Sequence, residues 1–487
     1  MNGILKRSIT EHAHALLKKE YSSEELTKAF LDRIDSENQE LNAYITVTHY
    51  HALREARASD ARRKDNATLS ILDGIPYAVK DNIAVKGIRL TCGSKMLRNY
   101  VSPYDSTVTT ILHESGAVLL GKTNLDEFAM GTGTETAYFG RTKNPLDLER
   151  VPGGSSGGSS AALAADLAVF ALGSDTGGSV RQPAAFCGVV GFRPTYSVLS
   201  RKGLVGFAPS LDTVGIMTRT VEDCKIIFES TAKKDVLDFT SSSYPMPDFS
   251  ALADNGIYGK KIAVVREIAE YKISEEERNA IEKTVNLFKS LGADVIEVSI
   301  PSIRSCYAAY YVISSAQASS NLARFDGVRF GFRADNASTV DELYTMSRSL
   351  GFGEEVKRRI LFGTLALNGS FKSDIYDDAL KTQAIIASEF AEALNLADIV
   401  ILPTSSDCAY KAGEHKNHLF DAHIEDDIFC TPASLCGLPA ISVPYKNICG
   451  LPLGVQLVGN RFGEKILFEA AHLLQEALKT KSKSESK

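Results

Sequence analysis

Apolar residues recur along the chain at two spacings, one typical of helices and one typical of buried strands. Near the N-terminus, Ser22 and Glu25 have the spacing of a helix capping box. The apolar residues after it lie at helical spacing and predict one buried face: Leu26, Ala29, Phe30 and Ile34. Residues 72–80 predict a turn and then a short buried strand that ends in Lys80. The chain therefore begins with helices and continues into a sheet.

The C-terminal half alternates strands with helices. Aliphatic runs predict strands at 261–265, 295–298, 399–402, 441–443 and 454–458. Helical spacing predicts helices after a Ser274 cap and at 382–394 and 464–478. This alternation predicts an α/β fold with a mixed β-sheet core covered by helices on both faces. No linker divides the chain, so we expect a single large domain over residues 1–478, with a helical segment at 1–60 packed on it. The Lys- and Ser-rich tail, 479–487, is expected to be disordered.

A short helix at 107–115, ended by Gly116, is expected to precede a strand at 117–120. The segment from Gly116 to Thr123 also matches the P-loop pattern letter for letter. A P-loop needs a flexible turn between a strand and a helix, whereas Ala-Val-Leu-Leu is typical of a strand interior. We therefore favour a strand. A nucleotide-binding regulatory protein stays as a third alternative, with Lys122 as the residue to test.

The most unusual stretch lies between residues 151 and 181, where two Gly-Gly-Ser elements flank an apolar segment. Within 161–171, alanines at helical spacing predict a thin helix that lets neighbouring backbones approach closely. Such glycine-rich runs are often flexible linkers, and a phosphate cradle is another alternative. A serine after Gly177 and Gly178 would, however, stand beside several backbone N–H groups. Acyl transfer needs this pairing of a nucleophile with oxyanion donors, so the stretch indicates a hydrolytic site.

The composition favours a soluble globular protein and argues against several other classes of protein. The 487 residues are 44% hydrophobic and 23% charged, as in soluble globular proteins, and the net charge of −6 argues against unaided nucleic-acid binding. We find no secretory signal and no apolar run of 18 or more residues, so no membrane span is expected. The eight cysteines form no C-x-x-C pair and are expected to be reduced thiols in a cytosolic protein.

The sequence shows no histidine that is an evident base for activating a serine. None of the nine histidines lies near either Gly-Gly-Ser element in sequence, which weakens a Ser-His-Asp triad without excluding it. His415, His418 and His423 form the one histidine cluster, but the spacing favours a polar loop and no metal site is expected. Lys80 is the best alternative base, because it ends an apolar strand and desolvation would lower its pKa. A surface lysine remains the simpler alternative.

Three motifs together resemble the signature of the amidase signature family. They lie at 153–159, 173–181 and 74–82, the last with the pattern Gly-x-Pro-x-x-x-Lys-Asp. The resemblance implies a Ser–cis-Ser–Lys triad with Ser179 as nucleophile, Ser155 as the bridging serine after a cis peptide bond, and Lys80 as base. It also implies an oxyanion hole made of backbone N–H groups from Thr176, Gly177 and Gly178, together with that of Ser179.

The resemblance is closer to one branch, the A subunits of tRNA-dependent amidotransferases. It covers nearly the whole chain and is carried by residues 310–315, 318–331, 351–363, 427–432 and 437–444. It implies that Arg359, or alternatively Arg358, binds the carboxylate of glutamine and that Asp427 binds its α-ammonium. Tyr310 and Gly131 would complete the substrate pocket. The chain departs from the branch at 368–373 and at Gly133, where a serine is common.

This branch implies a glutaminase. Glutamine would form an acyl-enzyme, and the ammonia would serve to convert Glu-tRNA(Gln) or Asp-tRNA(Asn) into Gln-tRNA(Gln) or Asn-tRNA(Asn). The expected assembly is a cytoplasmic heterotrimer with subunits B and C, in which the aminoacyl-tRNA is bound through the partner subunit. No cofactor is expected in this chain, and ATP and Mg are expected in the partner subunit. The alternative is a stand-alone amidase that acts on other amides, and the Arg359/Asp427 pair would distinguish the two.

Overall fold

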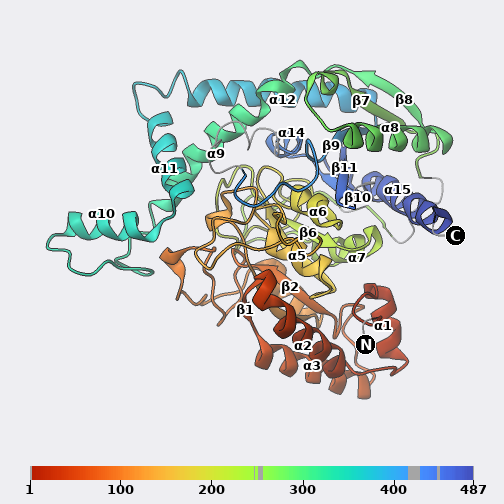
Figure 1. Ribbon diagram of the computed structural model, residues 1–487, viewed down its shortest axis with the longest axis horizontal. Coiled ribbons are helices and arrows are strands. Elements are labelled where there is room, and N and C mark those ends of the chain that lie inside the picture. Colours follow the sequence, from red (N-terminus) through yellow and green to blue (C-terminus); the bar gives the residue numbers. More distant parts are fainter. Residues whose placement is uncertain (1–2, 246, 250–255, 415–427, 447–449, 486–487) are drawn as a thin grey trace.

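The structure is a computed structural model that describes residues 3–245, 247–249, 256–414, 428–446 and 450–485 (Figure 1). In these residues eleven strands form one mixed sheet. In spatial order they are β1 (Tyr44–Val47), β3 (Val118–Thr123), β2 (Pro76–Lys80), β4 (Phe170–Asp175), β6 (Thr213–Thr218), β5 (Val190–Arg193), β10 (Ala440–Lys446), β11 (Pro452–Gly459), β9 (Ile399–Pro403), β7 (Lys261–Val265) and β8 (Asp294–Val298). The predicted α/β class and single mixed sheet are confirmed.

Strand direction changes along the sheet. β2 runs parallel to both β3 and β4, and β7 runs parallel to β8 and β9. The strands between these groups pair antiparallel, from β4 through β6, β5, β10 and β11 to β9. Because β2 and β4 are parallel neighbours, Lys80 and Asp175 end their strands at the same edge of the sheet.

Helices flank the sheet and follow the chain in three groups (Figure 1). The first comprises α1 (Ile9–Leu17), α2 (Ser23–Leu41) and α3 (His49–Lys64). The second comprises α4 (Thr107–Glu114), α5 (Gly157–Ala164), α6 (Arg181–Cys187) and α7 (Val221–Thr231). The third comprises α8 (Glu275–Ser290), α9 (Cys306–Leu322), α10 (Val340–Gly351), α11 (Glu354–Ala366), α12 (Tyr376–Leu396), α14 (Thr431–Cys436) and α15 (Glu464–Glu485). Figure 1 shows α10 projecting from the side formed by α9, α11 and α12.

Local sequence signals placed many of these elements well. Ser22 and Glu25 form the predicted capping box at the start of α2. Ser274 accepts a hydrogen bond from the N–H of Glu277 at the start of α8, and β7 has the predicted bounds. These elements are governed by residues adjacent in sequence, which is why a single sequence reveals them.

One element prediction was wrong. The alanine-rich helix begins earlier, at Gly157, and ends at Ala164; Asp166 takes a left-handed conformation (φ 59°), and Phe170 already begins β4. Pairing of β4 with β2 and β6 outweighs its helical spacing. The structure continues α15 to Glu485, into the tail from 479 that is predicted to be disordered, and Lys479 pairs with Glu476 one turn earlier.

The P-loop alternative is also wrong. Gly121, Lys122 and Thr123 are the last residues of β3, and every residue of that strand is buried. Lys122 Nζ lies 3.0 Å from Asp81 Oδ1 and donates to the carbonyl of Ile83 at 2.7 Å. A lysine paired inside the sheet is not available to a phosphate.

Two large apolar clusters divide the core. The first includes the strand residues Val79 and Leu172, and the second includes Tyr310 and Val356 from α9 and α11. The seven cysteines that the structure describes are free thiols, and none of the helices it describes is long and apolar enough to cross a membrane.

Candidate active site

Lys80 stands at the centre of a buried network of serines. It ends β2, has no exposed surface, and its Nζ atom lies 2.7 Å from Ser155 Oγ. The same nitrogen lies 2.9 Å from Ser156 Oγ and 2.9 Å from Ser174 Oγ. The sequence missed Ser156 and Ser174; only their positions in the two glycine-serine elements hinted at a role.

The charge state of Lys80 depends on its burial. Burial lowers the pKa of Lys80 to about 7, against the opposing effect of the carboxylates of Asp126, Asp175 and Asp212. The simpler alternative of a surface lysine is therefore wrong. At neutral pH a substantial fraction of Lys80 is the free amine, which accepts protons.

The two glycine-serine elements lie against each other. The peptide bond between Gly154 and Ser155 is cis, as the resemblance implies for the bridging serine. The N–H of Ser156 donates to the carbonyl of Ser179 at 3.2 Å, which links the loop of the bridging serine to that of the proposed nucleophile. Ser179 is nearly buried, with 8% of its surface exposed. The structure thus brings together Lys80, Ser155 and the Ser179 loop, from positions up to 99 residues apart.

Asp175 organises the turn that carries Ser179. Its carboxylate accepts hydrogen bonds from the N–H groups of Gly178, at 3.1 Å, and Val180, at 3.2 Å. Burial alone would raise its pKa, but the guanidinium groups of Arg181 and Arg193 hold the pKa of Asp175 well below its usual range. This carboxylate therefore stays charged and fixes the turn.

One predicted oxyanion donor already has an acceptor. Because the N–H of Gly178 donates to Asp175, the predicted donors left for an oxyanion are the N–H groups of Thr176, Gly177 and Ser179. The side chain of Thr176 is itself fixed, since its Oγ1 donates to Asp212 at 2.6 Å. The sequence could not reveal this, because it depends on how Asp175 folds back onto its own turn.

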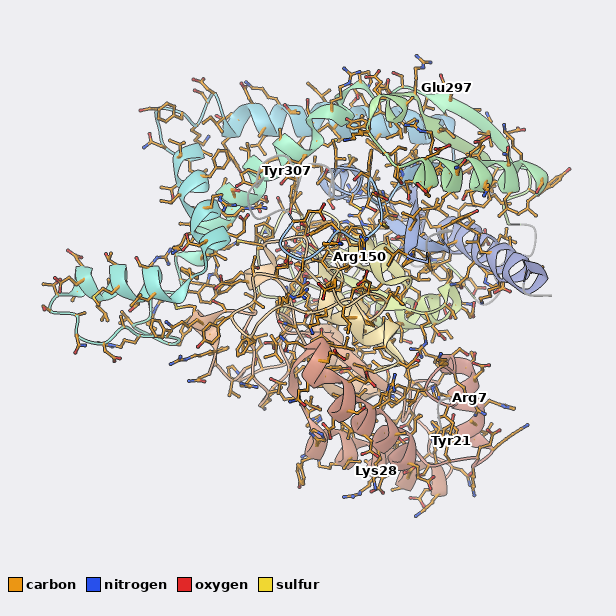
Figure 2. The ribbon with its side chains drawn as sticks, viewed as in Figure 1. Arg7, Tyr21, Lys28, Arg150, Glu297 and Tyr307 are labelled. Atoms are coloured by element: carbon orange, nitrogen blue, oxygen red, sulfur yellow. The ribbon has the colours of Figure 1, made fainter. Side chains whose placement is uncertain are left out.

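Tyr310 lies directly against the same loop. A Cβ atom at Gly177 would lie 2.5 Å from the ring of Tyr310, so only glycine allows this contact. Figure 2 labels Tyr307, which precedes Tyr310 by one turn on α9. Tyr310 thus forms a wall beside the loop of Ser179, and its part in a substrate pocket stays a prediction.

Arg359 is buried on α11, and Arg358 is only partly buried. Arg359 Nε donates to Glu355 at 2.8 Å, and its Nη1 donates to Ser314 on α9 at 3.3 Å. Burial alone would lower its pKa, but the carboxylate of Glu355 raises the pKa of Arg359, so the guanidinium is charged. Of the two candidate arginines, Arg359 has the better position for a carboxylate.

The remaining predicted residues are placed in part. Gly131 packs on the buried Asp126 carboxylate: a Cβ at Gly131 would lie 2.6 Å from Asp126 Oδ1. Asp427 and the histidines at 415, 418 and 423 lie outside the described residues. Within the described part of the chain, no group of His, Cys, Asp and Glu residues could hold a metal ion.

Comparison with known proteins agrees with this geometry. Residues 25–468 match the family model described as Amidase. The chain is 45% identical to the A subunit of glutamyl-tRNA(Gln) amidotransferase from Caldanaerobacter subterraneus subsp. tengcongensis, over 98% of both chains. It is 46% identical to the protein of the same name from Prochlorococcus marinus, over 96% of this chain and 97% of the other.

Solved structures give the same relationship. A crystal structure of the A subunit of glutamyl-tRNA(Gln) amidotransferase from Thermotoga maritima has a TM-score of 0.80 at 40% identity, covering 97% of this chain and 95% of the other. A peptide amidase from Stenotrophomonas maltophilia has a TM-score of 0.81 at 26% identity, covering 97% of each chain.

Proposed function

The chain belongs to the amidase family, and on that premise we propose that it is the glutamine-hydrolysing A subunit of a tRNA-dependent amidotransferase. The observation that carries the chemistry is that the buried Lys80 amine lies 2.7 Å from Ser155 Oγ. The next residue, Ser156, binds the Ser179 loop through its backbone N–H, so all three residues lie in one site. Buried lysine with serine is one of the ways in which proteins activate a hydroxyl nucleophile without histidine.

We infer two chemical steps. Ser179 Oγ attacks the side-chain amide carbon of glutamine, and its proton passes through Ser155 to the free amine of Lys80. The C–N bond then breaks, the leaving nitrogen takes a proton and departs as ammonia, and an ester joins the glutamyl group to Ser179. Water attacks this ester, glutamate leaves, and the proton returns to Ser179. The N–H groups of Thr176, Gly177 and Ser179 stabilise the oxyanion in both steps.

Recognition of a free amino acid needs charges at its α-end. Arg359, charged and buried beside α9, supplies a cation for the carboxylate. Tyr310 lies near both the Ser179 loop and that arginine, because its ring packs on Gly177 and it is among the groups that raise the pKa of Arg359. Asp427 is the proposed partner of the α-ammonium. Glutamine hydrolysis, rather than hydrolysis of an uncharged amide, follows from this charge pattern.

The wider assembly belongs to the same proposal. Subunits B and C would complete a heterotrimer in the cytoplasm, where the partner binds the aminoacyl-tRNA and uses ATP with Mg. This chain would need no cofactor. Its net charge of −6 supports a role in which tRNA is bound through the partner.

The test is ammonia release from glutamine by the purified chain and by the chain co-purified with its partners. We expect release in both, and conversion of Glu-tRNA(Gln) or Asp-tRNA(Asn) only in the complex with ATP. Hydrolysis of simple amides without glutamine turnover in either preparation would instead indicate a stand-alone amidase. No release from any amide would refute the hydrolytic assignment.

A further inference from the structure

Two neighbouring buried acids connect the catalytic loops to the helix of Arg359. Asp126 and Glu127 lie between β3 and the loop 131–136, and neither belongs to the proposed triad or pocket. Asp126 binds the loop around the bridging serine, whereas Glu127 binds the start of α11. Burying two adjacent carboxyl groups is costly, so the contacts they make require an explanation.

The Asp126 carboxylate binds the loop 134–136 by hydrogen bonds and lies next to the cis peptide. Its carboxylate accepts from the N–H groups of Thr134 at 2.8 Å and Glu135 at 3.0 Å, and from Thr136 Oγ1 at 3.0 Å. A Cβ at Gly154 would lie 2.2 Å from Asp126 Oδ2, so the carboxylate packs directly on the residue before Ser155.

Thr134 connects the Asp126 carboxylate to the loop of the bridging serine. Its Oγ1 donates to the carbonyl of Gly153 at 2.8 Å and accepts from the N–H of Gly157 at 3.0 Å. Thr134 therefore binds the chain on both sides of the cis bond. The loop of Ser155 is held through Thr134, and Thr134 is held by Asp126.

Glu127 makes the second connection. Its Oε2 accepts from the N–H of Gly353 at 2.7 Å, and its Oε1 accepts from Ser94 Oγ. Gly353 is the N-cap of α11, the helix on which Arg359 lies about two turns further on. The next residue, Phe128, packs on Phe352 with ring centroids 5.7 Å apart, which strengthens the same contact.

We propose that Asp126 and Glu127 are positioning residues that fix the bridging serine and the carboxylate-binding arginine relative to each other. Asp126 sets the efficiency of serine activation, and Glu127 sets the affinity for the α-carboxylate of the substrate. The Glu127 half rests on the proposed glutaminase function. The Asp126 half needs only the serine–lysine chemistry, so the two halves are tested separately.

The Asp126 half is tested with phenylmethylsulfonyl fluoride, which needs no glutamine pocket. Ser179 Oγ attacks its sulfur, fluoride leaves, and the serine proton passes to Lys80. We expect Asp126→Asn to slow this labelling at least tenfold, because an amide NH₂ faces N–H donors that need an acceptor. Thr134→Val removes the two loop contacts without changing the buried charge and should slow labelling too.

The pH profile separates positioning from general destabilisation. The negative charges of Asp126, Asp175 and Asp212 raise the pKa of Lys80, whereas burial raises the pKa of the nearby Cys92 thiol well above its usual value, so that Cys92 is neutral. Removing the charge of Asp126 lowers that pKa, so the acidic limb of the labelling profile should move to lower pH in Asp126→Asn. Thr134→Val should leave the limb in place.

The Glu127 half is tested by steady-state kinetics. Glu127→Ala should raise KM for glutamine about tenfold, with kcat changed much less and an uncharged amide affected little. Glu127→Gln should restore KM, because its amide oxygen accepts from Gly353 and its NH₂ donates to Ser94.

Glu267 offers a matched control. It is buried and likewise accepts from a serine hydroxyl, Ser299, and from a backbone N–H, that of Ile300 at 2.8 Å, but between β7 and η4 (Pro301–Ser305). Glu267→Ala should leave the KM of folded enzyme unchanged.

If both Asp126→Asn and Thr134→Val are labelled as fast as the wild type, the Asp126 half of the proposal is overturned. Equal losses on both substrates for Glu127→Ala, or no rescue by Glu127→Gln, would overturn the second. Labelling of wild type without glutamine turnover would refute the proposed function and leave the Asp126 half standing.

Discussion

The Nζ atom of Lys80 lies 2.7 Å from Ser155 Oγ, although the two residues are 75 positions apart. β2 brings the lysine to the edge of the sheet, and Ser155 follows Gly154 in the glycine-serine loop that lies against it. Burial keeps the amine partly neutral at neutral pH. This one contact is the geometry that the proposed roles of Lys80 as base and Ser155 as bridging serine require.

Replacing Lys80 by arginine should abolish hydrolysis as completely as replacing it by alanine. Arginine remains charged at any pH at which the protein is folded, so it cannot accept the serine proton. Ammonia release from glutamine measures the effect, and the melting temperature shows whether each variant folds. Substantial activity of Lys80→Arg would argue against proton transfer at this position.

The rate should depend on pH in a defined direction. Since burial lowers the pKa of Lys80 to about 7, the amine is protonated and inactive below that pH and becomes an active base above it. kcat/KM for glutamine should therefore rise through a limb centred near pH 7. A limb near pH 10, the ordinary range of lysine, would mean that the free enzyme holds Lys80 charged.

Ser179→Ala should remove activity and leave the fold intact. The serine makes a small contribution to packing on a glycine-rich turn, and the Asp175 contacts that hold the turn use backbone N–H groups. Mass spectrometry of enzyme quenched during turnover should find the glutamyl adduct on Ser179 in the wild type. An adduct on another serine would contradict the assignment.

Arg359→Ala should lower kcat/KM for glutamine by about tenfold to a few hundredfold, because a charge-assisted contact is worth on the order of 1.5–3 kcal/mol. Arg358→Ala is the matched control, since Arg358 also pairs with Glu355 but is more exposed. An uncharged amide should lose little in either variant. Asp427→Ala should resemble Arg359→Ala. Equal losses of kcat/KM on both substrates would mean that these residues stabilise the fold and do not bind the substrate.

Lys122→Met should destabilise the protein by about 3–5 kcal/mol, the usual effect of leaving a buried carboxylate without its partner. The carboxylate concerned is Asp81, which accepts from the N–H of Thr91 and pairs with Lys122. Urea unfolding measures the loss, and the double variant with Asp81→Leu should recover part of it. Nucleotide titration of the wild type should show no binding that depends on Lys122.

The sequence predicted what short-range patterns determine. The capping box at Ser22 and the strand at 261–265 depend on neighbouring residues, and the glycine-serine motifs both fall within the stretch 151–181. These signals were sufficient for the α/β class and for a hydrolytic site. The resemblance then supplied residue roles that no single pattern contained.

Other features depend on contacts that are distant in sequence. Glu127 meets Gly353 across 226 positions, and Ser174 meets Lys80 across 94. The Phe170 segment looked helical and became β4, because β2 and β6 provide backbone partners on both sides. The P-loop match failed for the same reason: burial in the sheet, not the letter pattern, decides what Lys122 does.

The proposed chemistry and the proposed recognition come from separate stretches of the chain. Val79 and Val180, the sequence neighbours of Lys80 and Ser179, belong to the first core, whereas Tyr310 on α9 belongs to the second, as does Val356 on the helix α11 that carries Arg359. Evolution could therefore alter α9 and α11 while leaving the nucleophile and its base untouched. A lineage with this architecture would inherit one hydrolytic reaction and acquire new substrates by changing segments other than the strands and loops of that reaction, with α9 and α11 foremost among them.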